Sequence, residues 1–219
     1  MNERTRKGFI YHTRTEDYKK HLKETIQIIE KIPEDYYVSY SGGKDSTVLT
    51  HLCLKANPSR IIWHWDYGDY LIPRPIEEEV MDNLYLLGAR RVIYDKRVGE
   101  DARTNHGYGY KQFFKTIQRN MCIYNLDGGI IGVRREESKT RKNRYTSYFQ
   151  EGNYYPLLNW TWGDVWGYIC VNNLPYVSTY DYYSEIGGWD KSRFVTFFDG
   201  EFEQLNMDDG VIMPEYRGY

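Results

Sequence analysis

Short apolar segments alternate with longer segments of helical spacing through most of the chain. Runs of β-branched, aliphatic and aromatic residues predict strands at residues 36–40, 60–65, 91–94, 129–133 and 154–158. Periodic apolar positions between them predict helices at residues 16–31, 45–56, 75–87, 111–124 and 161–171. Strands that alternate with helices favour an α/β fold with an open, mainly parallel, five-stranded and doubly wound sheet, covered by helices on both faces.

Two stretches depart from this alternation. Residues 95–110 show little periodicity and contain several Gly, Asn and Asp residues, which predicts a loop. Residues 180–219 are aromatic and acidic with no clear period, so we predict no regular structure there. We therefore expect an α/β domain at residues 1–179 and an irregular C-terminal extension at residues 180–219.

Composition indicates a soluble globular protein. The chain has 219 residues, of which 41% are hydrophobic and 27% are charged, and its formal net charge is -2. That charge argues against a generally basic nucleic-acid binder, although it leaves room for a local basic patch. The N-terminus is polar and no apolar run is long enough to span a bilayer, so we expect a cytoplasmic protein without a signal peptide.

The cysteines carry no metal or disulfide pattern. Cys53, Cys122 and Cys170 are scattered, form no C-x-x-C pair and each lie in an apolar context. We read them as small buried hydrophobic residues in a reducing compartment, and we expect no disulfide scaffold and no zinc site.

A glycine-rich loop follows the first predicted strand, which ends in Ser39 and Tyr40. The loop consists of Ser41, Gly42, Gly43, Lys44, Asp45 and Ser46. A glycine-rich turn from a strand into a helix directs backbone N–H groups and the positive end of the helix dipole at one point, which suits an anion. A carboxylate among anion-binding groups indicates that a cation such as Mg²⁺ also binds, so Asp45 is the predicted metal ligand. The alternative is a surface turn with a Gly-Gly C-cap.

Two further polar stretches follow predicted strands. The first consists of Trp65, Asp66, Tyr67 and Gly68, and its alternative interpretation is an Asx-type turn. The second runs over residues 132–141 and includes Gly132, Val133, Arg134, Glu137, Ser138 and Arg141. Its arginines suit phosphate or sulfate, while the alternative is a solvated charged loop. Because parallel strands end at one edge of the sheet, all three stretches are expected to converge on one crevice.

These stretches resemble a known family. The order Ser-Gly-Gly-Lys-Asp-Ser at residues 41–46 resembles the PP-loop of the ATP pyrophosphatase superfamily. Residues 66–68 resemble the Asp-Thr-Gly turn of the phosphoadenylyl sulfate (PAPS) reductase family, with Tyr67 in place of threonine. Residues 132–141 match that family's Gly-x-Arg-x-x-Glu-Ser-x-x-Arg pattern, and residues 156–169 its Pro-Leu-x-x-Trp-x-x-x-Asp-Val-Trp-x-Tyr-Ile segment. The resemblance spans residues 36–181 and implies an adenine nucleotide α-hydrolase-like, Rossmann-like fold.

The resemblance also implies an activity. It indicates an enzyme that binds ATP or a related adenylyl nucleotide with Mg²⁺ and cleaves at the α-phosphate, as a pyrophosphatase or an adenylating transferase in sulfur metabolism. Ser41, Gly42, Gly43, Lys44 and Ser46 would hold the leaving pyrophosphate, and Arg134 and Arg141 would stabilise developing charge. Lys44, Asp45, Arg134 and Arg141 are thus the expected catalytic residues.

The chain departs from the reductases downstream, because no cysteine follows Cys170. A thiolate nucleophile near the C-terminus and an iron–sulfur centre are therefore not expected. Two alternatives stay open, namely a PAPS or adenylyl sulfate reductase that uses an external thiol, and a non-catalytic nucleotide-binding subunit. The second substrate is not identified, and a nucleic-acid base remains open because basic residues at 134–144 precede Tyr145 and Tyr148. A homo-oligomer or a protein partner also remains open.

Overall fold

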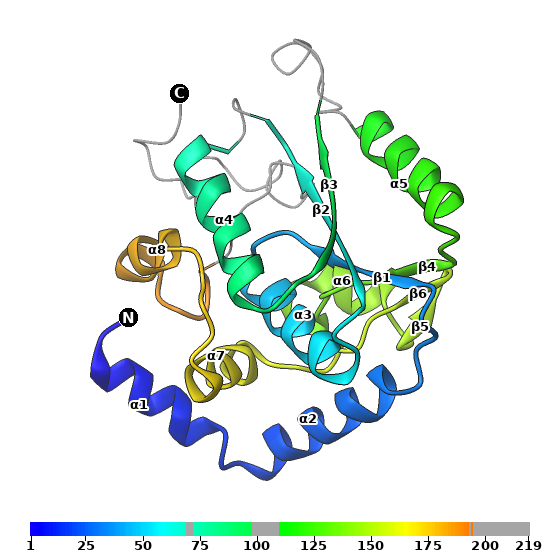
Figure 1. The fold of residues 1–219 in the computed structure, drawn as a ribbon. Coiled ribbons are helices and arrows are strands. Elements are labelled where there is room, and N and C mark those ends of the chain that lie inside the picture. Colours follow the sequence, from blue (N-terminus) through cyan, green and yellow to red (C-terminus); the bar gives the residue numbers. More distant parts are fainter. Residues whose placement is uncertain (69–71, 98–109, 193, 195–219) are drawn as a thin grey trace.

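A six-stranded sheet runs through the molecule in the order β3-β2-β1-β4-β6-β5 (Figure 1). The computed structural model describes residues 1–68, 72–97, 110–192 and 194. The strands are β1 (Tyr36–Tyr40), β2 (Ile61–Asp66), β3 (Arg91–Lys96), β4 (Gly128–Ile130), β5 (Phe149–Gln150) and β6 (Asn153–Tyr154). All neighbouring strands are parallel except β5 and β6, so the predicted α/β fold with a mainly parallel sheet is confirmed.

The number of strands differs from the prediction. The sequence indicated one strand at residues 154–158, whereas the structure has a short antiparallel hairpin of β5 and β6. Glu151 and Gly152 both have positive φ, as the two central residues of a type I′ turn require. Strands of two residues are too short to show an alternating pattern, which explains why the sequence predicted five strands and not six.

Helices surround the sheet. They are α1 (Glu3–His12), α2 (Glu16–Ile29), α3 (Lys44–Ala56), α4 (Arg74–Leu86), α5 (Tyr110–Tyr124), α6 (Lys139–Arg144), α7 (Trp162–Asn172) and α8 (Thr179–Gly187), with a 3₁₀ turn η1 (Arg135–Glu137). The five predicted helices correspond to α2, α3, α4, α5 and α7. No helix among the described residues is both long and apolar enough to cross a bilayer.

The two faces of the sheet support two separate cores. Val38, Ile62 and Ile130 point to one face and pack with residues of α2, α3, α4 and α7. Trp63 and Tyr37 point to the other face, where α5 contributes its partly buried apolar side chains. This alternation along each strand is what a doubly covered sheet requires.

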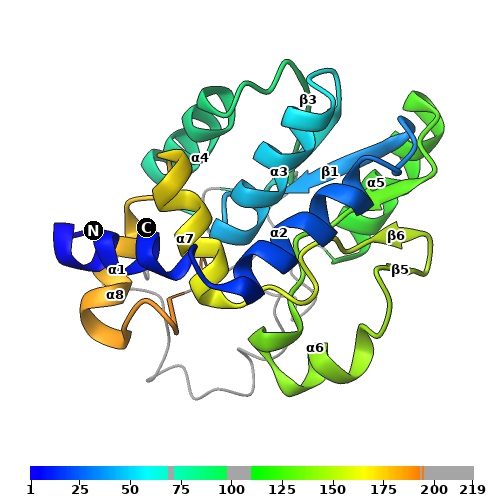
Figure 2. The ribbon, with the colours of Figure 1, turned by 90° about the horizontal axis from the view of Figure 1, so that it is seen from below.

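The N-terminal helix α1 packs on α7, far along the chain (Figures 1 and 2). Gly167 allows close contact, since a Cβ there would lie 2.7 Å from Thr13 Cγ2. The sequence did not predict α1, because Phe9 is its only buried residue and the rest of the helix is mostly polar.

The expectation of irregular structure from residue 180 needs correction at its start. Thr179–Gly187 forms α8, and Tyr180 within it is only 1% exposed. The packing of Tyr180 in the core stabilises this helix, although its sequence shows no regular apolar period. Residues 193 and 195–219 of that extension lie outside the described residues, and so do residues 98–109 of the predicted loop. The division into two domains stays a prediction.

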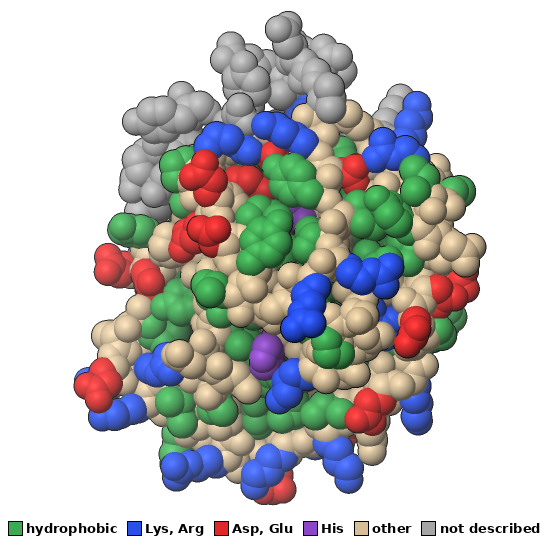
Figure 3. All heavy atoms as spheres, viewed as in Figure 1, with side chains coloured by type: hydrophobic (Ala, Val, Ile, Leu, Met, Phe, Trp, Pro, Cys, Tyr) green, Lys and Arg blue, Asp and Glu red, His purple; other side chains and the backbone are tan. Residues whose placement is uncertain are grey.

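The strand order places the polar loops at one edge. β1 lies between β2 and β4, with Tyr40 opposite His64 and Val38 opposite Ile130. The chain moves outward from β1 in both directions, so the loops after β1 and β4 flank the point where the strand order reverses. Ligands of open α/β sheets bind at such a point. Acidic and basic side chains are interspersed over the face seen in Figure 3.

Candidate functional site

The loop after β1 forms an anion-binding turn at the start of α3. Gly42 has a φ of +79°, in the left-handed region that favours glycine, and a Cβ there would lie 2.6 Å from Val80 Cγ2. Gly43 is the N-cap of α3 and supplies no side-chain hydrogen bond. The N-cap residue therefore supplies no side-chain acceptor to the first turn of α3, which suits an anionic ligand at the positive end of the helix dipole.

Two serines and a distant glycine shape this loop. Ser46 Oγ accepts the Ser41 N–H at 3.2 Å and donates to the Gly43 carbonyl at 2.9 Å. The Ser41 and Ser46 hydroxyl oxygens lie 3.2 Å apart. A Cβ on Gly132 would come within 3.2 Å of the Asp45 and Ser46 backbone, so glycine at this position lets the loops after β1 and β4 approach closely.

A buried charge cluster lies beneath the loop. Arg134 Nε donates to Asp45 Oδ1, and Lys44 Nζ lies 3.3 Å from Asp45 Oδ2. Burial alone would raise the pKa of Asp45, but Arg134 and Lys44 hold that pKa at about 2. Burial lowers the pKa of Lys44, whereas the pKa of Arg134 is raised because Asp45, Glu137 and Glu136 together outweigh its burial. The Asp45 carboxylate therefore stays ionised and its two oxygens are occupied by cationic partners.

A cavity of about 210 Å³ lies between the loops after β1 and β4. Many of the predicted site residues line it: Ser39, Ser41, Gly43, Lys44, Asp45, Ser46, Gly132, Val133, Glu137 and Arg141. Arg141 donates to Glu137 Oε2, which places an ion pair in the wall. The structure thus brings the first and third sequence stretches together.

The remaining predicted residues are not in the cavity wall: Tyr40, Gly42, Trp65, Asp66, Tyr67, Gly68, Arg134 and Ser138. Tyr40 is buried, and its hydroxyl donates to the Val80 carbonyl. Arg134 is 3% exposed behind Asp45, and Ser138 caps α6 by accepting the Arg141 N–H. In this structure these three side chains support the site and do not line it.

The Asp66 turn forms a separate cluster at the end of β2. Both carboxylate oxygens accept hydrogen bonds from Arg74, at 2.8 and 2.9 Å, and Tyr94 donates a third at 2.6 Å. Asp66 also accepts the Gly68 N–H, which is the Asx-type turn that the sequence left open. Burial would raise the pKa of Asp66, but these donors hold it at about 2. Trp65 points to the core beneath α5.

Residues near the end of the described chain complete the cavity, and the sequence did not identify them. Tyr180 and Phe194 lie in its wall. The Tyr180 hydroxyl accepts the Lys44 N–H at 2.9 Å and the Phe194 N–H at 3.0 Å, while Lys44 Nζ donates to the Ser192 carbonyl at 3.0 Å. The sequence predicted only irregular structure from residue 180, so it indicated no contact between Tyr180 and the loop.

The potential metal ligands and the cysteines both bear on the predicted chemistry. Within the described residues, no group of three or more His, Cys, Asp or Glu side chains could hold a metal ion. Cys53 and Cys170 are buried, as predicted, but the prediction was wrong for Cys122, which is exposed on α5. The face of an amphipathic helix on which a residue falls is set by packing, which the apolar context of Cys122 did not reveal.

The basic residues at 134–144 are mostly engaged within the protein. Arg135 donates to the carbonyls of Tyr145 and Thr146 and to Asn159. Arg134 is buried and paired with Asp45, and Arg141 is paired with Glu137. Only the other basic residues of the predicted cluster are therefore left for contacts outside the chain. The geometry offers no specific support for a nucleic-acid substrate.

Comparison with known proteins agrees with this geometry. Residues 35–194 match the phosphoadenosine phosphosulfate reductase domain. Similar curated proteins include sulfate adenylyltransferase subunit 2 of Acinetobacter baylyi, which is 27% identical, with 76% of this chain and 68% of the relative covered. The protein of the same name from Sulfurovum sp. is also 27% identical, with 89% of this chain and 75% of the relative covered. The chain therefore belongs to the phosphoadenosine phosphosulfate reductase domain family, as its motifs predicted, and is an enzyme of that PP-loop family.

Proposed function

We propose that the chain binds the phosphates of ATP in the cavity between the loops after β1 and β4 and transfers the adenylyl group to an oxyanion of the sulfate class. The observation that carries the proposal is the glycine-capped start of α3, which opens on a cavity that also holds the Arg141–Glu137 ion pair. Phosphates suit such a helix start, and a guanidinium suits the charge that develops on phosphate oxygens. The names of the relatives support sulfate as the acceptor.

The reaction follows from the groups in the cavity. An acceptor oxygen attacks the α-phosphorus, the bond to the oxygen that bridges to the β-phosphorus breaks, and pyrophosphate leaves with that electron pair. The Asp45 and Ser46 N–H groups in the first turn of α3, with the Ser41 and Ser46 hydroxyls, would bind the leaving pyrophosphate. Arg141, oriented by Glu137, would stabilise the charge on the transferred group. Lys44 and Arg134 would act mainly by fixing Asp45 and the loop.

A magnesium ion fits this site only as a companion of the nucleotide. Both Asp45 oxygens are held by Arg134 and Lys44, so this carboxylate could supply at most one ligand after local rearrangement. Mg²⁺ is commonly held by one or two carboxylates together with substrate phosphates and waters, and it neutralises phosphate charge there. The sequence-based assignment of Asp45 as the metal ligand remains a proposal.

The cysteines make reduction by an internal thiol a poor alternative. Burial raises the pKa of Cys53 to about 12 and also raises the pKa of Cys170, so neither thiol is activated as a nucleophile. Cys122 lies on α5, on the opposite face of the sheet from α3. Reduction of a sulfonucleotide would thus require an external dithiol as the electron donor.

The test compares two reactions and one binding measurement of the purified protein. ATP with Mg²⁺ and sulfate should form adenylyl sulfate and pyrophosphate in equal amounts. With inorganic pyrophosphatase present to remove the pyrophosphate, two phosphates should appear for each adenylyl sulfate. Sulfite release from PAPS or adenylyl sulfate with reduced thioredoxin would instead support the external-thiol reductase. Tight ATP binding by calorimetry without pyrophosphate release would support the non-catalytic subunit.

One pair of variants tests the site itself. Arg141→Gln should weaken ATP binding about tenfold, because it removes a charged donor from the cavity wall. Lys142→Gln removes the same charge from an exposed neighbour that does not line the cavity, and its ATP affinity should be unchanged. Equal affinities of the two variants in calorimetry would place the nucleotide elsewhere.

A further inference from the structure

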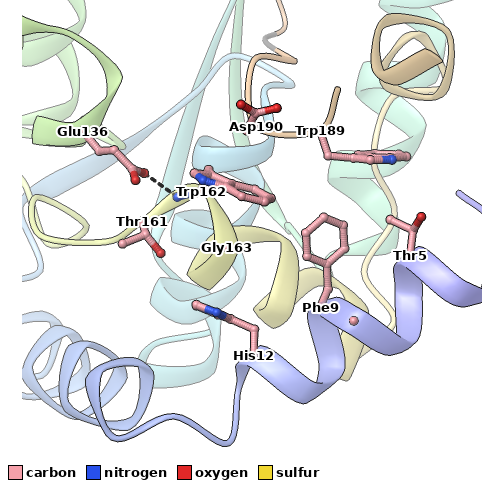
Figure 4. Close-up of a pocket in the computed structure, with 10 residues that line it drawn as sticks. Thr5, Phe9, His12, Glu136, Thr161, Trp162, Gly163, Trp189 and Asp190 are labelled. Atoms are coloured by element: carbon pink, nitrogen blue, oxygen red, sulfur yellow. Dashed lines mark hydrogen bonds between the residues drawn. The ribbon is translucent and has the colours of Figure 1, made fainter. Parts of the chain in front are cut away.

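A second cavity, of about 610 Å³, lies between α1, the start of α7 and the segment after α8 (Figure 4). Pockets that hold small organic ligands measure about 300–1,000 Å³, so this cavity is large enough for one. It shares no lining residue with the cavity at the β1 loop. The proposed nucleotide chemistry does not use it.

Three aromatic rings form the apolar walls of this cavity. Phe9 comes from α1, Trp162 from the start of α7, and Trp189 from the segment after α8, and both indoles lie against the Phe9 ring (Figure 4). Phe9 packs against each indole at nearly right angles, with centroids 5.8 Å from Trp162 and 6.1 Å from Trp189. Rings held at such angles present π faces to a ligand from more than one side, which is how aromatic cages bind cations.

The charged groups of the wall are acidic. Glu136 and Asp190 line the cavity, and no lysine or arginine is among the described residues of its wall. Glu136 Oε2 lies 2.8 Å from Arg134 and also accepts the Trp162 N–H, so its charge is partly compensated. Asp190 makes no ion pair within the described part of the chain. The ring of His12 also lines the wall, with Nε2 2.8 Å from the buried Asp164 carboxylate.

We propose that this cavity binds a small organic cation of the alkylammonium type. The rings of Phe9, Trp162 and Trp189 would contact the alkylated cationic centre, and Asp190 would compensate its charge. A neutral ligand would gain the aromatic contact but not the charge interaction, and an anion would face two carboxylates. The site lies where three segments distant in sequence meet, so its occupancy would also stabilise the packing of α1 on α7.

Choline and its uncharged isostere 3,3-dimethylbutan-1-ol provide the direct test. Isothermal titration of the full chain should give a choline dissociation constant of about 1 mM or lower, and binding of the alcohol should be at least about fivefold weaker. Equal affinity for the two compounds, or no heat change with choline at about 10 mM, would overturn the proposal.

Variants at Gly8 and Asp190 locate the site without touching the nucleotide cavity. Gly8 lies in the wall, and nothing lies within 4 Å of a Cβ built on it. Gly8→Leu should fill the cavity and abolish choline binding, whereas Gly8→Ala should retain it. Asp190→Asn should weaken choline binding about fivefold. Unchanged binding by Gly8→Leu would overturn the assignment of the cavity, and unchanged binding by Asp190→Asn would overturn the role of its charge.

Discussion

Gly42 shows how the backbone of a single residue constrains the nucleotide loop. A Gly42→Ala change would place a methyl group in the left-handed region and 2.6 Å from a methyl group of the fully buried Val80. We expect the free energy of unfolding to fall by about 2 kcal/mol or more, because strain and overpacking add.

Gly88 offers a matched control for that change. It also has a positive φ, at +91°, but nothing lies within 4 Å of a Cβ placed on it. Gly88→Ala should therefore lose only about 1 kcal/mol, from backbone strain alone. Urea denaturation of the two variants measures the difference. A loss as large for Gly88→Ala would show that the contact with Val80 is unimportant.

Asp66 should contribute to the loss of stability in acid. Its pKa is held at about 2 in the folded protein against an ordinary value of 3.8, so the folded state favours the ionised form. The stabilisation is fully present above the ordinary value and is lost as the pH falls toward 2. Asp66→Asn should be less stable than the native chain at pH 7, with a smaller difference near pH 3. Urea denaturation at both values measures this, and an equal difference at both would contradict it.

At the scale of elements, α8 is tied to the loop by one hydroxyl group. Tyr180→Phe would leave the buried Lys44 and Phe194 N–H groups without their acceptor, and we expect about 1–3 kcal/mol less stability. Tyr182 lies on the same helix but is 50% exposed, so Tyr182→Phe should change little. Denaturation of the two variants in parallel provides the measurement. Equal stability of Tyr180→Phe and the native chain would show that this contact is dispensable.

The elements themselves were largely predictable, and their mutual packing was not. The strands β1, β2 and β4 and the helices α2 to α5 and α7 were found because each buries a face, and β3 because Val92 and Ile93 are partly buried against the two cores. The short strand β5 and the helix α8 bury too few residues in regular order to be recognised. Sequence periodicity reports burial, and only elements that bury a regular pattern can be found from it.

The sequence predicted where the candidate site residues lie better than the direction in which their side chains point. The sequence placed Arg134 among the groups that contact phosphate, whereas in the structure it lies behind Asp45, to which it donates, and does not line the cavity. Motif spacing locates a residue at the end of a strand, but the charge that it pairs with lies 89 positions earlier in the chain. The sequence did not reveal the contribution of Tyr180 for the same reason, since its partner Lys44 lies 136 positions away.

At the scale of the whole molecule, one carboxylate joins the N-terminal helices to the rest. Asp164 is 1% exposed at the start of α7, where it accepts the Thr161 N–H. His12 of α1 contacts Oδ1 at 2.8 Å, and His21 of α2 contacts Oδ2 at 2.9 Å. Burial would raise the pKa of Asp164, but these contacts lower it. The cap of one helix is therefore also the anchor of two others.

Loss of this carboxylate should destabilise the chain far more than loss of an ordinary charge. Asp164→Ala removes a helix cap and leaves His12 and His21 without their partner, so we expect a loss of about 3 kcal/mol or more. Glu16→Ala, which breaks the exposed pair with Lys19 on α2, should lose about 1 kcal/mol or less. Denaturation at pH 7 compares the two. Equal losses would mean that aromatic packing alone, such as that of Phe9 on Trp166, holds the N-terminal helices in place.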